Sequence, residues 1–424
     1  MTEKNNVLII GNGGREHAIA LKLKESDKVG KLYCAKGNAG IGEIAELVDI
    51  DPCDIEGICA FVDSHPDIKM TVVAPDDPLA LGMVDELEKR GHRAFGPKRA
   101  AAQIEASKAF AKALMKKYGI PTAKYEVFES ANEAIRYIEK GSFPVVVKAD
   151  GLALGKGVII CSTLDEAKAA VKSMMLDGVF GKAGSKIVVE EYLEGKELTL
   201  LTFTDGETVY PMVSSCDHKR ALDNDMGLNT GGMGTIAPCP FLTKEMEEEI
   251  KEKIVHPTVK AMKAEGAPFK GVLYFGLMAT KDGVKVIEHN ARFGDPETQV
   301  VLPLLESDLY DIFDKIIDGR LKDIDIKWRN KSAVCVILAS GGYPEAYEKG
   351  KVITIGEIDE NCFICHAGTR AKDGKLITNG GRVLGACAVA DTLSEAIEKA
   401  YATAGKVHFE KMHYRKDIGK KYLG

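Results

Sequence analysis

The chain has 424 residues, of which 45% are hydrophobic and 28% are charged, and its formal net charge is −6. This length favours about two to four compact units, and the composition excludes a disordered chain. No segment carries a long run of lysine or arginine, which argues against nucleic acid or anionic membranes as main partners. The N-terminal apolar run is too short for a signal peptide, and no later stretch reaches the length of a membrane span, so a cytoplasmic protein is expected.

Ten cysteines are scattered over the chain, most of them inside apolar segments. In a reducing compartment such residues are small core side chains. One segment, Cys362-Phe-Ile-Cys365-His366, has the spacing of a covalent haem site or, without the histidine, of a redox pair. Haem attachment of that kind belongs to exported proteins, and the segment is predicted as a strand with Phe363 and Cys365 facing inward, so neither use is expected.

Residues 1–103 alternate short apolar runs with helical stretches, which predicts an open, Rossmann-like parallel sheet. The first strand is followed by the glycine loop 11–14 and a helix, and such a loop can present backbone N–H groups to an anion. A dinucleotide-binding fingerprint needs a small residue where this chain has Glu16, so a substrate phosphate or ribose is favoured over NAD. The expected strands are Val7–Ile10, Lys31–Ala35, Met70–Ala74 and Arg93–Phe95.

Asp76 and Asp77 follow the third of these strands after Pro75. Open sheets bind ligands at the carboxyl edge of their strands, so these carboxylates are expected to face the same crevice as the glycine loop. Ordinary loop or helix-start chemistry is the alternative for both residues.

A helix predicted over 100–118 leads into a second unit, where two strands, 144–150 and 157–161, flank a glycine-rich loop that contains Lys156. Such a loop can close as a lid over a polyphosphate, although it lacks the Gly-Lys-Ser/Thr ending of a Walker loop. Lys148 ends a run of three valines and is favoured as a phosphate ligand. The apolar strand that follows runs into Glu190, where an adenine could lie, but this signal alone is weak.

Two further features precede the strand that carries most of the chemistry. A hairpin through Asp205-Gly206 is predicted, followed by the polar run 216–220 and the glycine loop 229–234, which suit anion binding. A solvated loop is the alternative. A helix over 244–264 and a strand over 272–280 come next.

The segment Val284–Phe293 is predicted as a strand that places Glu288, Asn290 and Arg292 on one face, the face that also carries Val284 and Val286. A carboxylate and an amide oxygen two residues apart suit a hard divalent cation that borrows further ligands from phosphate. Magnesium-nucleotide binding is therefore predicted, and a merely solvated surface strand is the alternative.

After the lone Trp328 a third unit is predicted, ending in a helix over 393–408. Its turn 378–382 places an arginine at the start of a strand. The expected strands are Ala333–Leu338, Lys351–Ile355, Cys362–His366 and Arg382–Ala390.

Seven of these motifs occur in an order that resembles the glycinamide ribonucleotide synthetase family of ATP-grasp enzymes. They are Gly11–His17, Gly151–Gly157, Asp217–Arg220, Asn229–Gly234, Glu288–Glu297, His366–Thr369 and Asn379–Arg382. The resemblance runs nearly end to end and implies an α/β fold, with an ATP-grasp core between an N-terminal open parallel-sheet domain and a small C-terminal α+β domain. The implied limits are 1–103, 104–328 and 329–424, with a lid sub-domain at about 122–192.

The resemblance also implies roles for single residues. The implied catalytic residues are Arg292, Lys219 and Asp217, and the implied ligands of Mg²⁺ or Mn²⁺ are Glu288 and Asn290. The residues that would bind ATP are Lys108, Lys148, Gly155, Lys156, Gly157, Glu190, Leu193 and Glu197. The residues that would bind the substrates are Gly13, Gly14, Arg15, Glu16, Asp76, Arg220, Gly294, Asp295 and Arg382.

The implied reaction joins glycine to phosphoribosylamine through glycyl phosphate, with ATP as the phosphoryl donor. Two departures from the family pattern stand out, since Asp76 replaces a glutamate and Gly276 replaces an acid that often binds a second metal ion. Another ATP-grasp ligase, a nucleotide-binding regulatory protein and, more distantly, a dinucleotide oxidoreductase remain as alternatives. Transient contact with the amidotransferase that makes the unstable amine is a further hypothesis.

Overall fold

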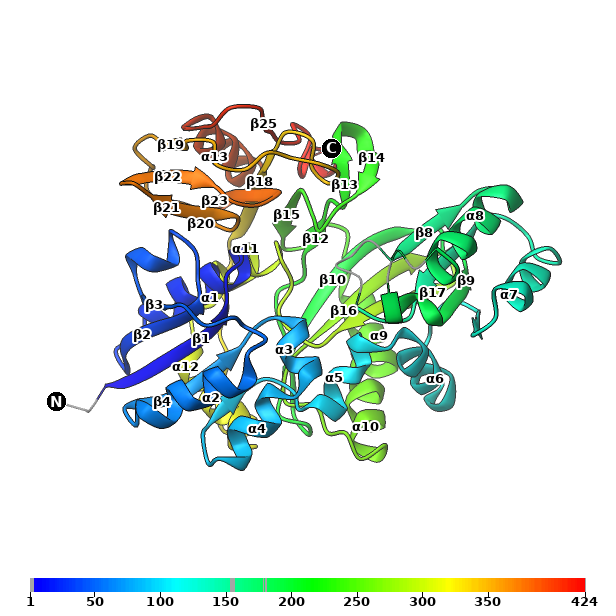
Figure 1. Cartoon of the computed structure of the whole chain (residues 1–424), viewed down its shortest axis with the longest axis horizontal. Helices are drawn as coiled ribbons and strands as arrows, with labels where there is room; N and C mark the ends of the chain where they lie inside the picture. The colour runs from blue at the N-terminus through cyan, green and yellow to red at the C-terminus, as the bar shows by residue number, and fades with distance from the viewer. Residues whose placement is uncertain (1–3, 153–156, 178, 180, 424) are drawn as a thin grey trace.

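Five parallel strands form the sheet at the N-terminal end of the chain, in the order β3-β2-β1-β4-β5 (Figure 1). The computed structural model describes residues 4–152, 157–177, 179 and 181–423. Val7 to Ile10 of the central strand are fully buried, because both faces of the sheet are covered. The elements are β1 Asn5–Gly11, α1 Gly14–Lys24, β2 Val29–Lys36, β3 Glu46–Val48, α2 Ile55–Ser64, β4 Ile68–Val73, α3 Asp76–Leu81, α4 Met83–Lys89 and β5 Ala94–Phe95.

This sheet confirms the open parallel fold predicted for the region and adds β3, which was not predicted. That strand has only three residues, of which Glu46 and Leu47 are exposed, so it carries no apolar run by which it could be recognised. Helix α12 (Leu309–Ile317), from a much later part of the chain, packs against β5. The ring of Phe313 stacks on that of Phe95 with centroids 3.7 Å apart.

The helix predicted over 100–118 is two helices, α5 (Arg99–Ala106) and α6 (Lys108–Tyr118). Ser107 between them has an extended backbone, and its hydroxyl accepts a hydrogen bond that caps α6. The carboxylate of Asp150 accepts a hydrogen bond from the first turn of α6 and so ties this helix to the second unit. The break lies where both helices contact the strand predicted over Val284–Phe293, called the metal strand below because it carries the predicted metal ligands.

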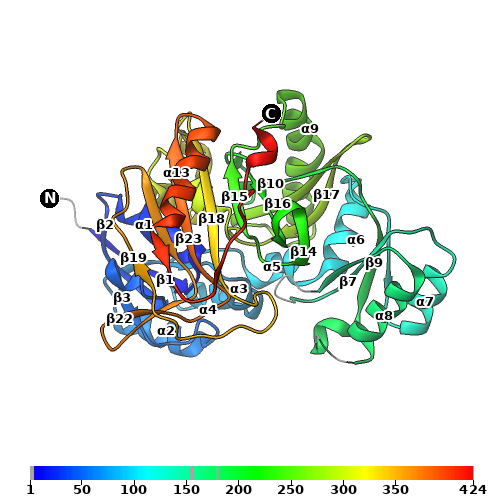
Figure 2. The ribbon, with the colours of Figure 1, turned by 90° about the horizontal axis from the view of Figure 1, so that it is seen from above.

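The second unit contains an antiparallel sheet in the order β6-β9-β7-β8, with α7 and α8 packed against it (Figure 2). It has a hydrophobic core of its own, built from both helices and the sheet. The predicted pair of strands around the glycine loop is confirmed, while residues 153–156 of the loop lie outside the described residues. The elements are β6 Tyr125–Phe128, α7 Ala131–Ile138, β7 Val145–Ala149, β8 Val158–Cys161, α8 Leu164–Met175 and β9 Ile187–Glu191.

A second antiparallel sheet, in the order β11-β10-β16-β17, lies beside this unit. It includes the predicted hairpin through Asp205-Gly206. The helix predicted over 244–264 is present as α9 and α10 with a π-helical turn, Lys251–Val255, between them. The elements are β10 Lys196–Thr204, β11 Val209–Pro211, α9 Lys244–Ile250, α10 His256–Ala264, β16 Gly271–Thr280 and β17 Gly283–Asn290.

The register of β17 corrects the prediction that Glu288 shares a face with Val286. Val286 pairs with Leu277, whereas Glu288 pairs with Gly276, so Ile287 is an extra residue and forms a β-bulge. Adjacent residues of β16 point to opposite faces, and therefore Val286 and Glu288 do so too. Val286 lies fully buried in the core, while Glu288 is turned to the other side of the sheet.

The C-terminal sheet has the order β12-β15-β18-β23-β20, with β25 paired to β18, and α13 packs against it. Two of its strands, β12 and β15, come from the segment before β16. The strand predicted over 351–355 is reduced to two residues. The elements are β12 Cys216–Asp217, β15 Gly234–Ala237, β18 Ser332–Ser340, β19 Thr354–Ile355, β20 Cys362–His366, β23 Arg382–Ala390, α13 Leu393–Gly405, β24 Val407–His408 and β25 Met412–His413.

Three short two-stranded ribbons and one small helix complete the fold. β13 pairs with β14, β19 with β24, and β21 with β22. Helix α11 contacts α1 and the C-terminal sheet, so it joins the first and third units. The elements are β13 Arg220–Leu222, β14 Met226–Asn229, α11 Thr298–Val301, β21 Thr369–Lys372 and β22 Lys375–Thr378.

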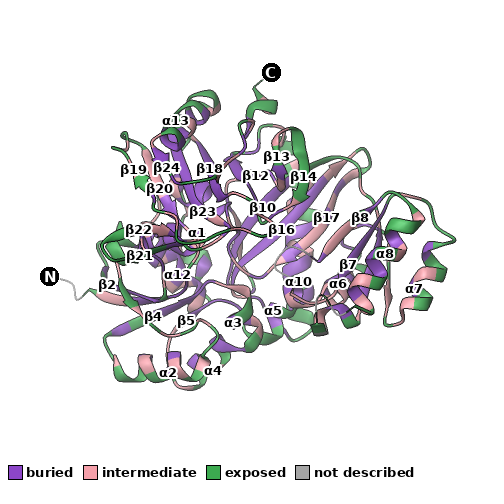
Figure 3. Ribbon diagram, turned by 45° about the horizontal axis from the view of Figure 1, so that its top comes forward, coloured by how far each residue is buried: buried purple, intermediate pink, exposed green. Residues whose placement is uncertain are grey.

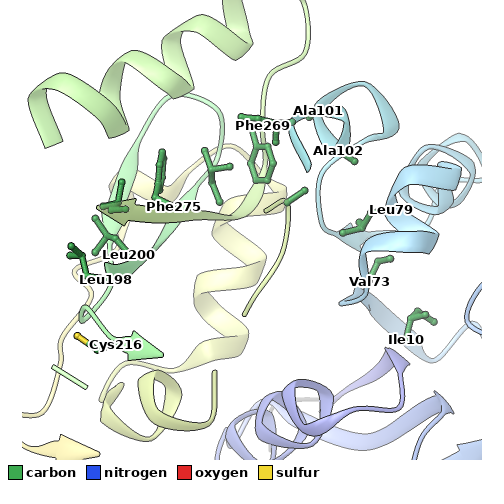
Figure 4. Packing of buried hydrophobic residues seen from close by; sticks show 14 of the residues in the cluster. Ile10, Val73, Leu79, Ala101, Ala102, Leu198, Leu200, Cys216, Phe269 and Phe275 are labelled. Carbon is green, nitrogen blue, oxygen red and sulfur yellow. The ribbon is translucent and has the colours of Figure 1, made fainter. Parts of the chain in front are cut away.

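Buried residues concentrate in the strands and in the helix faces that contact them, as Figure 3 shows. One large core cluster extends from the N-terminal sheet to the β10-β16 sheet. Helix α5 contributes Ala101 and Ala102 to this cluster, which also contains Phe269 and Phe275 (Figure 4). The position of α5 is therefore fixed by apolar packing on the same core that holds β16 and β17.

Candidate active site

A buried cluster of charges joins the β6-β9-β7-β8 sheet and helix α6 to the β17 strand. The carboxylate oxygen Oε2 of Glu190 lies 3.0 Å from Nζ of Lys148 and 3.0 Å from Nζ of Lys112, and all three side chains are at most 5% exposed. Lys148 also donates a hydrogen bond of 3.1 Å to the carbonyl of Ile287, the bulged residue of β17. Two ammonium groups thus share one carboxylate, which leaves a net positive charge suited to an anion.

Two observations indicate that this cluster is incompletely paired within the described residues. The second oxygen of Glu190, Oε1, is buried without a hydrogen-bond partner among the described residues. Burial lowers the pKa of Lys112 to about 8, against the raising effect of Glu190. Burial likewise lowers the pKa of Lys108, whose ammonium donates to the carbonyl of Gly151 at 3.0 Å. A bound anion would stabilise the charged form of these lysines.

Glu288 is held in its ionised form by positive neighbours. Nζ of Lys219 lies 3.4 Å from its Oε1 and 3.8 Å from Oε2 of Glu197. Lys219, more than offsetting burial and assisted by Lys148, lowers the pKa of Glu288 to about 2. A carboxylate that stays charged at neutral pH is the ligand that Mg²⁺ or Mn²⁺ requires.

Asn290 and Arg292 both contact Glu105, a residue that the sequence did not single out. The guanidinium Nη2 of Arg292 lies 2.7 Å from Oε1 of Glu105. The hydrogen-bonding surroundings of Asn290 place its amide nitrogen 3.0 Å from the same oxygen, and the carbonyl oxygen therefore points to the other side. Burial raises the pKa of Glu105 to about 7 in spite of Arg292. No motif marks Glu105, because it lies in a helix far from the strand in sequence.

The residue types at the end of β17 fit a metal ion that is shared with a nucleotide. Glu288 and Asn290 supply two oxygens, and the lysines beside them can hold phosphate oxygens that complete the coordination. Among the described residues, no group of three or more histidine, cysteine, aspartate or glutamate side chains could hold a metal ion. The fit is therefore to Mg²⁺ or Mn²⁺ bound with a phosphate, rather than to a closed protein site.

Asp217 begins the polar run on the other side of Lys219. Its Oδ1 accepts hydrogen bonds from the N–H of His218 (2.7 Å) and the hydroxyl of Thr235 (3.4 Å). Burial and the negative charge of Glu297 raise the pKa of Asp217 well above its usual range. Lys219, two residues after Asp217, contacts Glu288, and the catalytic roles of Asp217 and Lys219 stay a prediction.

The carboxylate of Glu16 hydrogen-bonds back to the N-terminal glycine loop. Oε2 of Glu16 accepts a hydrogen bond of 2.6 Å from the N–H of Gly13, and its Oε1 lies 2.6 Å from Nε of Arg15. Arg15 also donates a hydrogen bond of 3.1 Å to the carbonyl of Phe293. Glu16 therefore fixes the loop, and Arg15 links it to the segment that follows the metal strand.

Arg382 joins the third unit to the rest of the site. Its Nη1 donates hydrogen bonds to the carbonyls of Gly231 (2.6 Å) and Asp295 (2.7 Å), and its Nη2 lies 3.2 Å from Oδ2 of Asp295. Against the effect of burial, Arg382 and then Arg15 hold the pKa of Asp295 below its usual range. The predicted substrate residues of three distant segments are thus brought together around Asp295.

The remaining predicted site residues have more varied surroundings. Asp76 is the first residue of α3. Burial alone would lower the pKa of Arg292, but the negative charges of Glu105 and, to a smaller extent, Asp76 raise it. Arg220 donates to the carbonyl of Gly227 at 2.8 Å, within the β13-β14 ribbon. The carbonyl of Gly294 accepts a hydrogen bond from the hydroxyl of Thr298. The carbonyl of Gly157 accepts one from the backbone N–H of Ala149. Leu193 is half-buried. Gly14 is the first residue of α1, and Gly155 and Lys156 lie outside the described residues.

Three consecutive family models match the chain. Residues 5–105 match the N domain, 106–298 the ATP-grasp (A) domain and 333–421 the C domain of phosphoribosylglycinamide synthetase. In the described part of the chain, no helix is long and apolar enough to cross a membrane.

Named relatives match over the whole length. A phosphoribosylamine–glycine ligase of Caldanaerobacter subterraneus is 50% identical over 416 residues, which covers 98% of this chain and all of the relative. The crystal structure of the phosphoribosylamine–glycine ligase of Thermotoga maritima has a TM-score of 0.85 at 35% identity, covering 97% of this chain and 99% of that one. The biotin carboxylase domain of a 2-oxoglutarate carboxylase from Hydrogenobacter thermophilus shares the fold, with a TM-score of 0.75 at 16% identity over 98% of this chain and 92% of that one.

Proposed function

Because the chain belongs to the phosphoribosylglycinamide synthetase family, we propose that it joins glycine to 5-phosphoribosylamine, with conversion of ATP to ADP and phosphate. The product is glycinamide ribonucleotide, an intermediate of purine biosynthesis. The observation that carries this function is the match of all three domains of the family, in order, over residues 5–421.

ATP is assigned to the space between the lid sheet and the β10-β16-β17 sheet. The shared positive charge of Lys148, Lys112 and Glu190 supports phosphate binding there, and Lys108 lies at the same junction. Oε1 of Glu190, which has no hydrogen-bond partner in the part of the chain that the structure describes, is suited to accept the adenine amino group. Glu197 is exposed enough to accept the ribose hydroxyls. Leu193 and the loop residues Gly155, Lys156 and Gly157 complete the proposed set.

Mg²⁺ or Mn²⁺ is assigned to Glu288 and Asn290. A bound ion would neutralise charge on the phosphates, which is the chemistry it supplies in phosphoryl transfer. The ionised state of Glu288 and the outward carbonyl of Asn290 both suit that role.

The proposed reaction has two steps, and neither requires a covalent bond to the protein. A carboxylate oxygen of glycine bonds to the γ-phosphorus while the bond to the bridging oxygen of ADP breaks, which yields glycyl phosphate. The amine of phosphoribosylamine then bonds to the carbonyl carbon, phosphate leaves, and the amine loses a proton. Arg292 and Lys219 would stabilise the negative charge on the transferring phosphoryl group. Asp217 would help to orient the substrate glycine.

The two substrates are assigned to the space around Asp295. Gly13, Gly14, Arg15, Glu16 and Asp76 line the carboxyl edge of the first sheet, where phosphoribosylamine would lie. Arg220, Gly294 and Arg382 complete the proposed set, with Arg382 as the candidate for the substrate phosphate. Because the guanidinium of Arg382 is now paired with Asp295, phosphate binding would share or replace that pair.

We also propose the limits of the three units, the location of the protein in the cell and one protein partner. The chain would consist of units 1–103, 104–328 and 329–424, with a lid at about 122–192. It would act in the cytoplasm, where purine intermediates are made. It would also contact transiently the amidotransferase that supplies its unstable amine, and a sensitive pull-down with that enzyme tests this contact.

ADP release tests the proposed reaction directly. Purified protein is incubated with Mg²⁺, ATP, glycine and freshly made phosphoribosylamine, and each component is omitted in turn. Release that requires both glycine and the amine is expected. Release that depends on another amino acid would show that the protein is a different ATP-grasp ligase. Nucleotide binding without ADP release would show that it is a regulatory protein.

A further inference from the structure

One buried carboxylate holds three consecutive residues at the end of the metal strand. Oε2 of Glu105 accepts a hydrogen bond of 2.7 Å from the backbone N–H of Ala291. Oε1 lies 2.7 Å from Nη2 of Arg292. The amide orientation of Asn290 is assigned from its hydrogen-bond partners, and it places the amide nitrogen 3.0 Å from Oε1 of Glu105 and 3.1 Å from the carbonyl oxygen of His289. The side chain of Glu105 is only 7% exposed, so it has exchanged water for these three partners.

These contacts replace the strand partner that β17 loses. The ladder between β16 and β17 ends at the pair Tyr274 and Asn290, and Ala291 has no partner in that sheet. The carboxylate from α5 accepts the next backbone N–H and therefore fixes the direction in which the chain leaves the sheet. Helix α5 is anchored in the same core as β16, so this support is rigid.

The same contacts determine which atoms remain available to a ligand. An amide whose nitrogen donates to Glu105 must present its oxygen elsewhere, so Asn290 keeps its oxygen free for a cation. Arg292 has Nη2 on Glu105 and Nη1 3.3 Å from the carbonyl of Phe293, while its Nε is buried without a partner in the described residues. That unpartnered N–H is a donor that a bound oxyanion would satisfy.

We propose that Glu105 is a positioning residue, which sets the orientation of Asn290 toward the metal and of Arg292 toward the transferring phosphoryl group. The proposal rests on the proposed function, because it assigns the ligand of each of these two residues. A buried structural ion pair, important for stability alone, is the competing explanation.

Glu105→Gln separates the two explanations. The oxygen of the new amide can still accept the Ala291 N–H, but its NH₂ group then faces two donors, those of Asn290 and Arg292. The amide nitrogen of Asn290 loses Glu105 as an acceptor and keeps the carbonyl oxygen of His289 at 3.1 Å, so one of the two hydrogen bonds that orient the amide is removed. We expect kcat to fall about 100-fold at pH 8, by analogy with loss of an electrostatic stabiliser. KM for ATP at saturating Mg²⁺ should change less than about threefold, since Lys148 and Lys112 remain.

Metal binding provides a measurement that does not depend on turnover. Mn²⁺ binding to the protein with a non-hydrolysable ATP analogue, followed by electron paramagnetic resonance, should weaken about tenfold in Glu105→Gln, as for loss of an outer-shell partner. The matched control is Glu56→Gln, which removes an exposed carboxylate 2.7 Å from Arg90 in the first unit and should change neither turnover nor Mn²⁺ binding.

Glu105→Asp is the second variant, because it retains the charge and shortens the side chain by one methylene. It should recover part of the turnover and of the Mn²⁺ affinity that Glu105→Gln loses. The proposal would be overturned if Glu105→Gln had the kcat and the Mn²⁺ affinity of wild type. If only its unfolding temperature were lower, Glu105 would be a structural residue alone. If wild-type protein released ADP only with another amino acid, the proposed function would fail while the Mn²⁺ measurement still tested Glu105.

Discussion

The ammonium group of Lys148 lies 3.0 Å from the carboxylate of Glu190, and both side chains are at least 95% buried. The pair joins the adjacent strands β7 and β9. Glu190 lies opposite Val146 in the register of these strands, two residues before Lys148. Lys148 therefore reaches diagonally across the sheet and continues to β17, where it bonds to the bulged carbonyl. One side chain thus connects the lid, the proposed adenine contact and the metal strand.

Replacement of Lys148 by methionine should weaken ATP binding while the sheet is retained. The lost charge-assisted hydrogen bond corresponds to about 1.5–3 kcal/mol, or roughly 10- to 100-fold in affinity. Titration calorimetry with a non-hydrolysable ATP analogue measures this change. Lys168→Met in α8 is the matched control, because Lys168 pairs with Glu139 on the exposed face of the same unit. Equal affinities of both variants and wild type would remove Lys148 from the nucleotide site.

Replacement of Glu288 by glutamine should raise the requirement for Mg²⁺. The substitution keeps the size of the side chain but removes the charge that Lys219 now stabilises in the folded protein. We expect the Mg²⁺ concentration for half-maximal ADP release to rise at least about tenfold. Glu248→Gln, on the exposed side of α9, is the control and should leave that concentration unchanged. An unchanged Mg²⁺ dependence in Glu288→Gln would exclude Glu288 as a ligand.

Gly276→Ala should impair the site through Glu288. A Cβ at position 276 would lie 2.9 Å from Cγ of Glu288 and 3.4 Å from a ring carbon of Tyr274, so the glutamate must move. We expect lower turnover and weaker Mn²⁺ binding, with the unfolding temperature lowered by only a few degrees, about 1 kcal/mol. Gly266→Ala would be a poor control because of its positive φ, whereas Gly405→Ala at the end of α13 meets no atom within 4 Å. Unaltered metal binding in Gly276→Ala would show that Glu288 tolerates displacement.

Stability should fall as the pH decreases below 6.5, in part because of His17. Burial, with a smaller contribution from His366, lowers the pKa of His17 to about 3. The unfolded chain takes up this proton near pH 6.5, so stability from neutral His17 is fully present above 6.5. It is lost by about 1.4 kcal/mol per pH unit as the pH falls toward 3. Thermal unfolding midpoints should therefore decrease less between pH 7 and pH 5 in His17→Gln than in wild type.

His408→Gln is the control for this pH dependence, because His408 is exposed at the end of β24. Its unfolding midpoint should follow that of wild type at every pH. The same slope for His17→Gln and wild type would show that His17 is not kept neutral by the fold.

Thiol reactivity should be confined to one cysteine in the native protein. All ten cysteines are free, and Cys53 is the exposed one, whereas Cys362 is half-buried and the others are buried. Burial raises the pKa of the Cys161 thiol to about 11, and that of Cys34 further, so these two buried thiols are also poor nucleophiles. An Ellman titration should detect about one fast thiol, which Cys53→Ser removes, and all ten only after denaturation. Rapid reaction of Cys362 or Cys365 would instead support the alternative that these two cysteines form a redox pair.

The sequence predicts the succession of strands and helices well, because most of it depends on local periodicity. The first sheet follows from fully apolar runs such as Val7–Ile10, and the hairpin through Asp205-Gly206 follows from its turn residues. The family motifs then identify the chemistry, since each is a short contiguous segment. Elements without such a signal, such as β3, were not predicted.

The face of the metal strand could not be predicted, because a bulge interrupts its alternation. Period-two reasoning placed Val286 and Glu288 together, and one extra residue, Ile287, separates them. Glu105 was missed for a different reason. Its partners at positions 290–292 are far away in sequence, and only the packing of α5 on the core brings them within hydrogen-bond distance.

The pairing of β15 with β18 has a consequence for the synthesis of the chain on the ribosome. Gly234–Ala237 emerges long before its partner Ser332–Ser340, and until then its free edge is open to other strands. β18 in turn keeps a free edge until β23 has been made, so the last sheet is completed only when the polypeptide is nearly finished. Nonsense truncations after residue 331 or earlier should therefore yield aggregating fragments rather than a functional ATP-binding half.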